Sequence, residues 1–134
     1  YFTLMATIFS KIISGEIPAY KILENDQFLA FLDVFPLAKG HALVIPKNET
    51  DYIFDIDDKE LGEMMVFAKK VSKAIKSAFP CAKIGVSVVG LEVPHAHIHL
   101  IPINQVSDMN FSKPKLSFTK EEMESMAESI KSFL

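Results

Sequence analysis

The sequence of 134 residues predicts an α+β fold, with about five mostly antiparallel strands in one sheet and helices packed on it. Three observations lead to this prediction. Short apolar runs are bounded by turn residues, which is typical of strands. Two longer segments repeat apolar residues at helical spacing behind a capping residue. No internal repeat, low-complexity segment or linker interrupts the chain, so we expect a single domain.

The N-terminal third of the chain predicts one short helix and three strands. Thr7 is a suitable N-cap for a helix from about residue 8 to residue 14, and Gly15 ends it. The runs "YKILEN" and "QFLAFLD" predict two strands that meet at an Asn-Asp turn. The run "HALVIP" predicts a third strand, which begins after Gly40 and ends at Pro46.

Two further helices and two further strands are predicted in the rest of the chain. A long helix has Asp57 as its N-cap and repeats apolar residues at helical spacing: Leu61, Met64, Met65, Ala68, Val71, Ile75 and Phe79. The runs "KIGVSVV" and "PHAHIHLIPI" predict two strands joined closely around Gly90. Thr119 and Glu122 form a capping box for a last helix. Its apolar stripe consists of Met123, Met126, Ala127, Ile130 and Phe133.

Composition narrows the class of protein. Met5 resembles a natural start, so we interpret residues 1–6 as a cloning remnant followed by the N-terminus. No basic segment precedes an apolar block, and no apolar run reaches about 18 residues, so neither a signal peptide nor a membrane helix is predicted. A single cysteine, Cys81, excludes an internal disulfide, and we expect a cytoplasmic protein. The net charge of −3 argues against a partner with a nucleic-acid backbone, but not against a small phosphate ligand.

Three of the four histidines occupy alternate positions in the run "VPHAHIHLIP": His95, His97 and His99. In a helix, side chains two residues apart point roughly 200° apart. In a strand they share one face and lie about 6.7 Å apart along the chain. The residues between and after the histidines are apolar. This pattern predicts that three imidazoles line one face of a strand whose other face packs on the core.

Three explanations of the histidine cluster remain open from the residues alone. The histidines are tolerated on a solvated face, or they bind a metal with His41 as a further ligand, or they perform nucleophilic catalysis. Consecutive same-face positions of one strand are poorly suited to a tetrahedral ion about 2.1 Å from each nitrogen. Catalysis needs a nucleophile, an orienting group and a proton donor, and neighbouring imidazoles supply all three. We therefore favour catalysis and expect neither a metal nor another cofactor.

The run "HAHIHLI" matches His-φ-His-φ-His-φ-φ, with φ apolar, which is the signature of the histidine triad (HIT) family. Residues 7–47 also resemble the N-terminal half of Hint-type nucleotide-binding proteins of this family. The resemblance covers about residues 7–103 and implies a HIT-like fold there, with residues 104–134 as a C-terminal extension. It implies an enzyme that acts at the α-phosphate of a purine nucleotide. It also implies a homodimer through residues 61–79 and 83–89.

The resemblance implies a role for each histidine. His97 resembles the nucleophile that attacks the α-phosphorus and forms a nucleotidyl-histidine intermediate. His99 resembles the residue that holds a phosphate oxygen beside it. His95 and His41 resemble supporting groups whose hydrogen bonds set the tautomer of His97.

The resemblance also implies the nucleotide-binding residues. Asp33 resembles the acidic residue that binds the ribose hydroxyls, and its two acceptor oxygens suit that role. The residues that resemble the apolar slot for the base are Ile8, Phe9, Ile12, Phe31, Val34 and Leu43.

The loop before the triad departs from the Hint-type pattern. In "VSVVGLEVPH" the loop is shorter, the family's Asn is absent, and Glu92 stands where a small hydroxyl residue is expected. A carboxylate close to phosphate oxygens is repulsive, so we expect Glu92 to contact the leaving group and to favour amines. The Hint-like N-terminal half implies that phosphoramidate-type conjugates rank before dinucleoside polyphosphates as substrates. The altered loop keeps open a third function, a non-catalytic nucleotide-binding module, and the C-terminal extension is expected across the pocket or the dimer seam.

Overall fold

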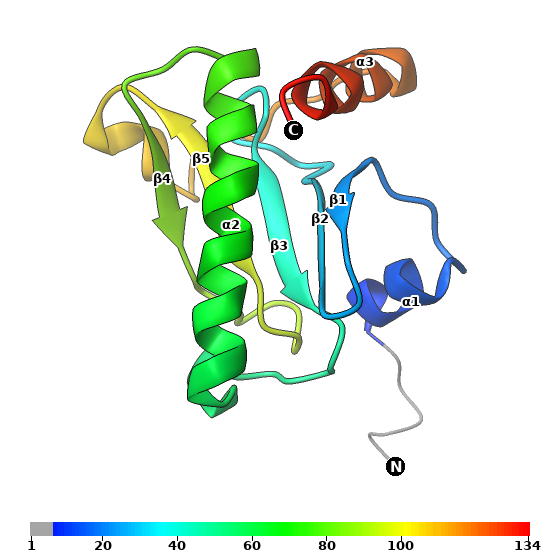
Figure 1. Ribbon diagram of the computed structural model, residues 1–134. Helices are drawn as coiled ribbons and strands as arrows, with labels where there is room; N and C mark the ends of the chain where they lie inside the picture. Colours follow the sequence, from blue (N-terminus) through cyan, green and yellow to red (C-terminus); the bar gives the residue numbers. More distant parts are fainter. Residues whose placement is uncertain (1–6) are drawn as a thin grey trace.

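The computed structural model describes residues 7–134 (Figure 1). The predicted start at Met5 and the cloning remnant lie outside these residues. The helices and strands are α1 (Ile8–Ser14), β1 (Lys21–Glu24), β2 (Phe28–Leu32), β3 (Ala42–Pro46), α2 (Asp58–Ala78), β4 (Lys83–Ser87), β5 (Ile98–Ile103) and α3 (Lys120–Lys131). Two short 3₁₀ helices, η2 (Ile53–Asp55) and η3 (Val106–Met109), lie in the connections before α2 and after β5.

The strands form one sheet in the order β1-β2-β3-β5-β4, and each neighbouring pair is antiparallel. This arrangement confirms the predicted α+β fold, with a short N-terminal helix, one long helix and an additional C-terminal helix. β5 follows β4 in the chain but lies between β3 and β4 in the sheet. The strand that carries His99 is therefore an interior strand, next to the strand that follows His41.

β5 begins later than the sequence predicts. The expected strand covers residues 94–103, but the ladder begins at Ile98. Before it, the backbone N–H of Ala96 donates to the carbonyl oxygen of Thr50, 2.6 Å away. Because this N–H bonds to a loop, the segment does not join the sheet there. Of the three triad histidines, only His99 lies in regular strand structure, so the prediction of three imidazoles along one strand is wrong.

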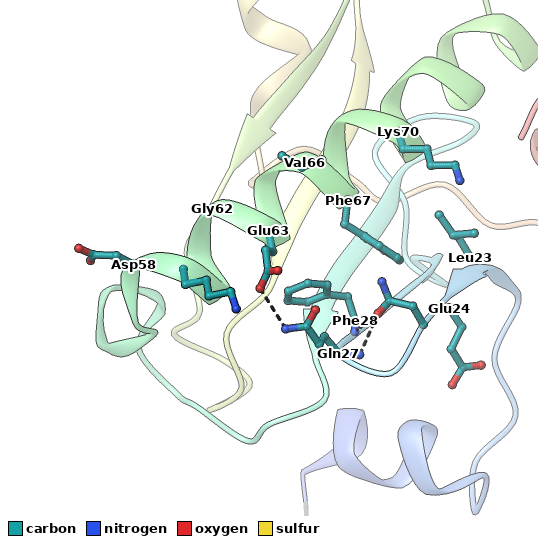
Figure 2. Close-up of a pocket in the computed structure, with 12 residues that line it drawn as sticks. Leu23, Glu24, Gln27, Phe28, Asp58, Gly62, Glu63, Val66, Phe67 and Lys70 are labelled. Atoms are coloured by element: carbon teal, nitrogen blue, oxygen red, sulfur yellow. Dashed lines mark hydrogen bonds between the residues drawn. The ribbon is translucent and has the colours of Figure 1, made fainter.

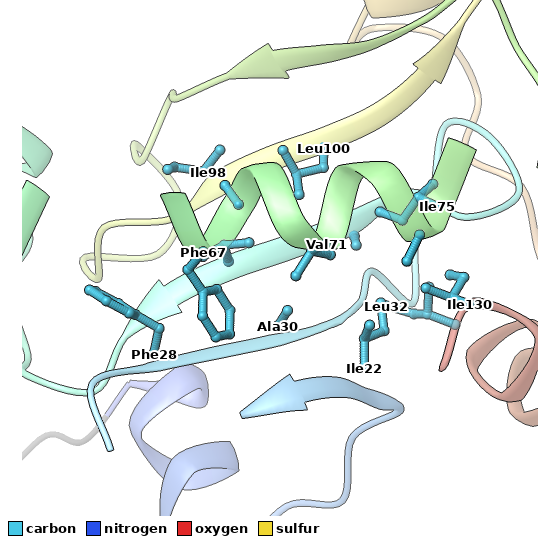
Figure 3. Close-up of a cluster of buried hydrophobic side chains, with 14 of the residues drawn as sticks. Ile22, Phe28, Ala30, Leu32, Phe67, Val71, Ile75, Ile98, Leu100 and Ile130 are labelled. Carbon is cyan, nitrogen blue, oxygen red and sulfur yellow. The ribbon is translucent and has the colours of Figure 1, made fainter. Parts of the chain in front are cut away.

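The two faces of the sheet carry separate apolar clusters. α2 lies along one face, and α3 lies beside the C-terminal half of α2 (Figure 1). Figure 3 shows the larger cluster, in which Phe67, Val71 and Ile75 of α2 pack over the strands. α1 covers the opposite face, where the smaller cluster contains Phe9, Ile12, Leu29, Phe31, Leu43 and Ile45. Alternate strand residues point to opposite faces, so one strand contributes to both clusters.

The predicted caps are present at both long helices. The Asp57 carboxylate accepts a hydrogen bond of 2.8 Å from the Glu60 N–H at the start of α2. Thr119 and Glu122 form the capping box of α3. Two residues of the predicted apolar stripes are exposed: Met65 and Phe133. Within the described part of the chain, no helix has the length and apolar character needed to cross a membrane.

Candidate active site

The triad histidines, His41 and Asp33 converge on the face of the sheet that α1 covers. The register explains this, because Phe31 of β2, Leu43 of β3 and His99 of β5 are neighbours across the sheet. Side chains two residues apart share a face, so Asp33 and His41 lie beside that row. All four histidines are buried. The explanation of histidines tolerated on a solvated face is therefore wrong.

His97 has one ring nitrogen held by the backbone. Its Nδ1 lies 2.8 Å from the backbone carbonyl oxygen of His95. A carbonyl oxygen only accepts, so a neutral His97 carries its proton on Nδ1 and its lone pair on Nε2. The resemblance implies that hydrogen bonds from His95 and His41 set this tautomer. The structure assigns that function to the backbone of His95, and the ring of His41 bonds elsewhere.

The ring of His41 bonds to His99 and sets the tautomer of that residue. The Leu37 N–H donates to Nδ1 of His41 over 2.9 Å, so the proton of a neutral His41 is on Nε2. That Nε2 lies 3.0 Å from Nδ1 of His99. His99 must accept there, which leaves its own proton on Nε2. The Leu37 N–H fixes the proton of His41, and His41 in turn fixes the proton of His99. His99 is therefore a hydrogen-bond donor through its Nε2.

Burial keeps this pair of imidazoles neutral. Burial, with smaller effects from His99 and Lys115, lowers the pKa of His41 to about 3. It lowers the pKa of His99 to about 4, with a smaller effect from His97. Loss of water disfavours the imidazolium form, so both residues are uncharged near neutral pH. The tautomers deduced from the hydrogen bonds therefore apply under ordinary conditions.

His95 is the most buried member of the triad, and its ring turns toward the end of β3. Its Nε2 lies 2.8 Å from the Pro46 carbonyl oxygen, and its Nδ1 lies 3.5 Å from the Thr7 hydroxyl. Burial lowers the pKa of His95, and the Pro46 carbonyl opposes that effect. The ring of His95 joins the triad segment to β3 and to the N-cap of α1. The backbone carbonyl oxygen of His95 accepts the hydrogen bond from His97.

Asp33 lies at the edge of the histidine cluster. Its Oδ2 is 3.5 Å from Nε2 of His41, and its Oδ1 accepts a 2.8 Å hydrogen bond from the Phe35 N–H. Burial raises the pKa of this carboxyl, while the Phe35 N–H and the neighbouring His97 and Lys115 oppose the rise. The side chain is partly accessible, so its oxygens are within reach of a ligand.

The residues expected to hold the base divide into two groups. Phe9, Ile12, Phe31 and Leu43 are buried together under α1. The ring of Phe9 also meets the ring of His97 edge to face, with centroids 4.9 Å apart. Ile8 and Val34 instead lie at the surface and are 50% and 53% exposed. The role of these six residues in binding a base stays a prediction.

Asp33, His41 and His99 each offer a ligand atom, and these atoms lie within 4.8 Å of one another. The hydrogen-bond pattern nevertheless disfavours a metal there. A metal on Nε2 of His41 requires the lone pair of that nitrogen, which moves the proton of a neutral ring to Nδ1. Nδ1 already faces the Leu37 N–H, and two donors would then oppose each other. The residues present fit a proton-sharing pair better than a zinc ligand set.

One residue that the sequence singles out and one hollow of the surface are not among the contacts of the histidine cluster. Glu92 is exposed, and the contact of its carboxylate with the leaving group stays a prediction. A hollow of about 820 Å³ lies between the β1–β2 turn and α2, with Phe28 and Phe67 on its wall (Figure 2). None of its lining residues is a histidine.

Sequence reasoning missed Phe111, which contacts the triad, and Lys115, whose ammonium donates to the Phe111 carbonyl oxygen. The Phe111 ring meets the His99 ring with centroids 4.8 Å apart. The charge of Lys115 acts on both Asp33 and His41. Both residues lie in the C-terminal extension, outside the resemblance, and no local pattern marks them. The expectation that the extension reaches across the pocket agrees with these contacts.

Comparison with known proteins adds independent information. Residues 14–106 match the sequence profile of the HIT domain. An adenosine 5'-monophosphoramidase of Schizosaccharomyces pombe is 35% identical over 130 residues, which cover 96% of this chain and 98% of that protein. An adenosine 5'-monophosphoramidase of Saccharomyces cerevisiae is 43% identical over 98 residues, 72% of this chain and 62% of that protein.

A solved structure agrees with the sequence relatives. The crystal structure of a HIT-like protein from Bartonella henselae has a TM-score of 0.83 and 32% identity to this chain. The match covers 96% of each chain, so it includes the C-terminal extension as well as the triad. The triad signature, the fold and the matched profile agree, and the chain belongs to the HIT family.

Proposed function

We propose that this protein hydrolyses, or transfers the nucleotidyl group of, purine nucleoside monophosphate conjugates, with phosphoramidates as preferred substrates. One observation supports the proposal most directly. The free Nε2 of His97 and the Nε2–H of His99 follow from their hydrogen bonds, and the two rings lie 5.0 Å apart. A nucleophile and a donor are thus next to each other, as phosphoryl transfer through a covalent intermediate requires.

The proposed reaction has two steps. The Nε2 lone pair of His97 attacks the α-phosphorus, the bond from phosphorus to the leaving nitrogen breaks, and the amine departs with a proton from solvent. The His95 carbonyl stabilises the positive charge on the nucleotidyl-imidazole through the Nδ1–H. Water then attacks the same phosphorus and loses a proton to solvent, while the bond from phosphorus to Nε2 breaks and its electron pair returns to Nε2. The His99 Nε2–H donates to a phosphate oxygen in both steps.

The preference for phosphoramidates rests on the relatives. Two fungal proteins that match this chain are adenosine 5'-monophosphoramidases. We carry over their adenylate and their phosphorus–nitrogen bond as the substrate class, with Asp33 as the acceptor for the ribose hydroxyls. A dinucleoside polyphosphate is the second candidate, because exposed Glu92 offers less repulsion to a charged leaving group than the sequence suggests.

A panel of adenylate conjugates tests the proposed function. We expect adenosine 5'-phosphoramidate to be hydrolysed with a kcat/KM at least about tenfold above that of a diadenosine polyphosphate. The reason is that we expect the bond to the leaving group, phosphorus–nitrogen or phosphorus–oxygen, to affect the rate more than the charge of the leaving group does. Release of adenosine monophosphate, measured by chromatography, is the readout. Tight binding of adenosine monophosphate without turnover of any conjugate would instead establish a non-catalytic binding module.

We also propose that the protein is a homodimer through α2 and β4. Val86 pairs with Leu100, whose side chain is buried under α2, so Val86 points to the α2 side of the sheet. It is nevertheless 50% exposed, and Val66 of α2 is 69% exposed. β4 is an edge strand, so its outer backbone groups have no strand partner within the described chain. A second copy of the chain would cover the exposed valines and the outer edge of β4.

The dimer proposal predicts a change in mass. Light scattering should give twice the chain mass of 15.0 kDa for the wild type and a mass near 15.0 kDa for Val86→Glu. A buried carboxylate pair across a two-fold interface is strongly unfavourable, which is the physical reason. Phe133→Glu is the matched control, because Phe133 is similarly exposed but follows α3. A wild-type mass near that of one chain would refute the dimer.

A further inference from the structure

The C-terminal extension passes over the histidine cluster as a strap, which we define as residues 110–116. The strap follows η3 and leads to α3. The Leu116 N–H donates to the Pro36 carbonyl oxygen over 2.8 Å, which fixes the end of the strap to the loop between β2 and β3. That loop carries Asp33 and precedes His41. The strap is therefore attached to the same segment that determines the His99 tautomer.

Phe111 gives the strap a direct contact with the site. Its ring meets the ring of His99 edge to face, with centroids 4.8 Å apart and planes at 66°. Edge-to-face packing of this kind is a favourable arrangement for two rings. The imidazole of His99 is therefore packed against the strap. Phe111 thus forms a wall beside the position proposed for the α-phosphate.

Lys115 brings a positive charge to the same place. Its ammonium donates to the backbone carbonyl oxygens of Phe111 and, over 3.4 Å, of Lys113. These are the only acceptors recorded for it within residues 7–134, and the side chain is exposed. Burial raises the pKa of Asp33 and lowers that of His41, and the Lys115 charge lowers both. The ammonium is held at the backbone of Phe111, whose ring contacts His99, so it lies next to the histidine cluster.

His41 and His99 supply no positive charge to a bound phosphate. His41 and His99 are held neutral by burial. The whole chain contains no arginine, so every permanent cation on a side chain is a lysine. A bound nucleotide places a negatively charged phosphate beside His99. An ammonium held only by exposed carbonyl groups exchanges them for phosphate oxygens at little cost, because a charged acceptor binds it more strongly.

We propose that Lys115 is a specificity-determining residue that binds the phosphate of the ligand and selects nucleotides over nucleosides. The inference rests on the proposed function for the position of the phosphate. Lys115 leaves its carbonyl partners in the strap and donates to phosphate oxygens on the side of His99 that Phe111 does not occupy. Asp33 and the apolar slot bind the nucleoside part independently, so the lysine acts on the charged group alone.

The test compares adenosine monophosphate with adenosine in calorimetric titrations. Lys115→Ala should weaken adenosine monophosphate about tenfold and change adenosine less than about twofold, because one charge-assisted hydrogen bond is lost. Lys115→Arg should keep most of the affinity for the monophosphate. Lys113→Ala is the matched control, since Lys113 is exposed in the same strap, and it should behave as the wild type.

The outcomes separate this proposal from the proposed function. Equal weakening of both ligands by Lys115→Ala would mean that the lysine only supports the strap, and unchanged binding of the monophosphate would also overturn the proposal. Wild-type protein that binds monophosphate in a Lys115-dependent way but hydrolyses no conjugate would leave this inference intact and remove the enzymatic function. Normal turnover together with monophosphate binding that does not depend on Lys115 would support the enzymatic function and overturn this inference. Wild-type protein that does not bind the monophosphate would refute the phosphate contact itself.

Discussion

His97→Ala is expected to abolish formation of the covalent intermediate and to lower phosphoramidate hydrolysis by on the order of 10³-fold or more. Alanine leaves no lone pair to attack the phosphorus, and neither His95 nor His99 replaces it. The proton of His95 Nε2 is committed to the Pro46 carbonyl, and Nδ1 of His99 is committed to His41. Affinity for adenosine monophosphate should stay within about tenfold, because ribose and base contacts are separate.

Intact-protein mass spectrometry after a rapid quench measures this effect. The wild type with a slow substrate should gain the mass of one adenylate, and the variant should not. Free imidazole supplied to His97→Gly is a further control, because it occupies the vacated space as an external nucleophile and should restore part of the turnover. Unchanged hydrolysis in His97→Ala would show that the nucleophile is another group.

A pair of substitutions at His99 is expected to separate its two ring nitrogens. His99→Asn should lower kcat/KM by on the order of 10²-fold, the size of effect seen when one oxyanion donor is removed. Its amide lies near the position of Nδ1, so it keeps the contact with His41 and loses the donor to the phosphate. The amide of His99→Gln reaches the position of Nε2, so this variant should retain several-fold more activity than the Asn variant.

The order of the two variants is the decisive readout. Steady-state kinetics on adenosine 5'-phosphoramidate should rank the wild type above Gln, and Gln above Asn. Thermal melts of both variants show whether the buried contact with His41 is lost in the Gln protein. If Asn retained more activity than Gln, the proton of His99 would be on Nδ1. The hydrogen bond between His41 and His99 would then run in the opposite direction, and the Leu37 N–H could not donate to Nδ1 of a neutral His41.

Local sequence patterns were sufficient for the elements of this fold. The Asp57 cap, the Thr119–Glu122 capping box and the helical spacing after each cap predict α2 and α3. These features depend on residues within one or two turns of each other. The apolar residues between the triad histidines also predict which side chains enter the core, and Ala96 and Ile98 are buried there. The triad signature was enough to predict the HIT family.

The chain's own pattern did not reveal where β5 begins. Alternation of histidine and apolar residues is the same in a strand and in an extended segment that pairs with a loop. The Ala96 N–H bonds to Thr50, which is 46 residues earlier in the chain, and that choice depends on the position of the loop before α2. The alternation of histidine and apolar residues predicts which face of the sheet the Ile98 side chain occupies. It does not predict the orientation of the His95 ring.

Tautomers and charge in the site depend on contacts between distant parts of the chain. Residue types and spacing determine that this protein is an α+β HIT protein with a histidine cluster, because capping, periodicity and alternation act over a few residues. Only the tertiary structure decides that Leu37 orients His41, that His41 orients His99, and that Phe111 reaches the triad. Hydrogen-bond direction and burial depend on every atom around a group, and these atoms come from segments that meet only after folding.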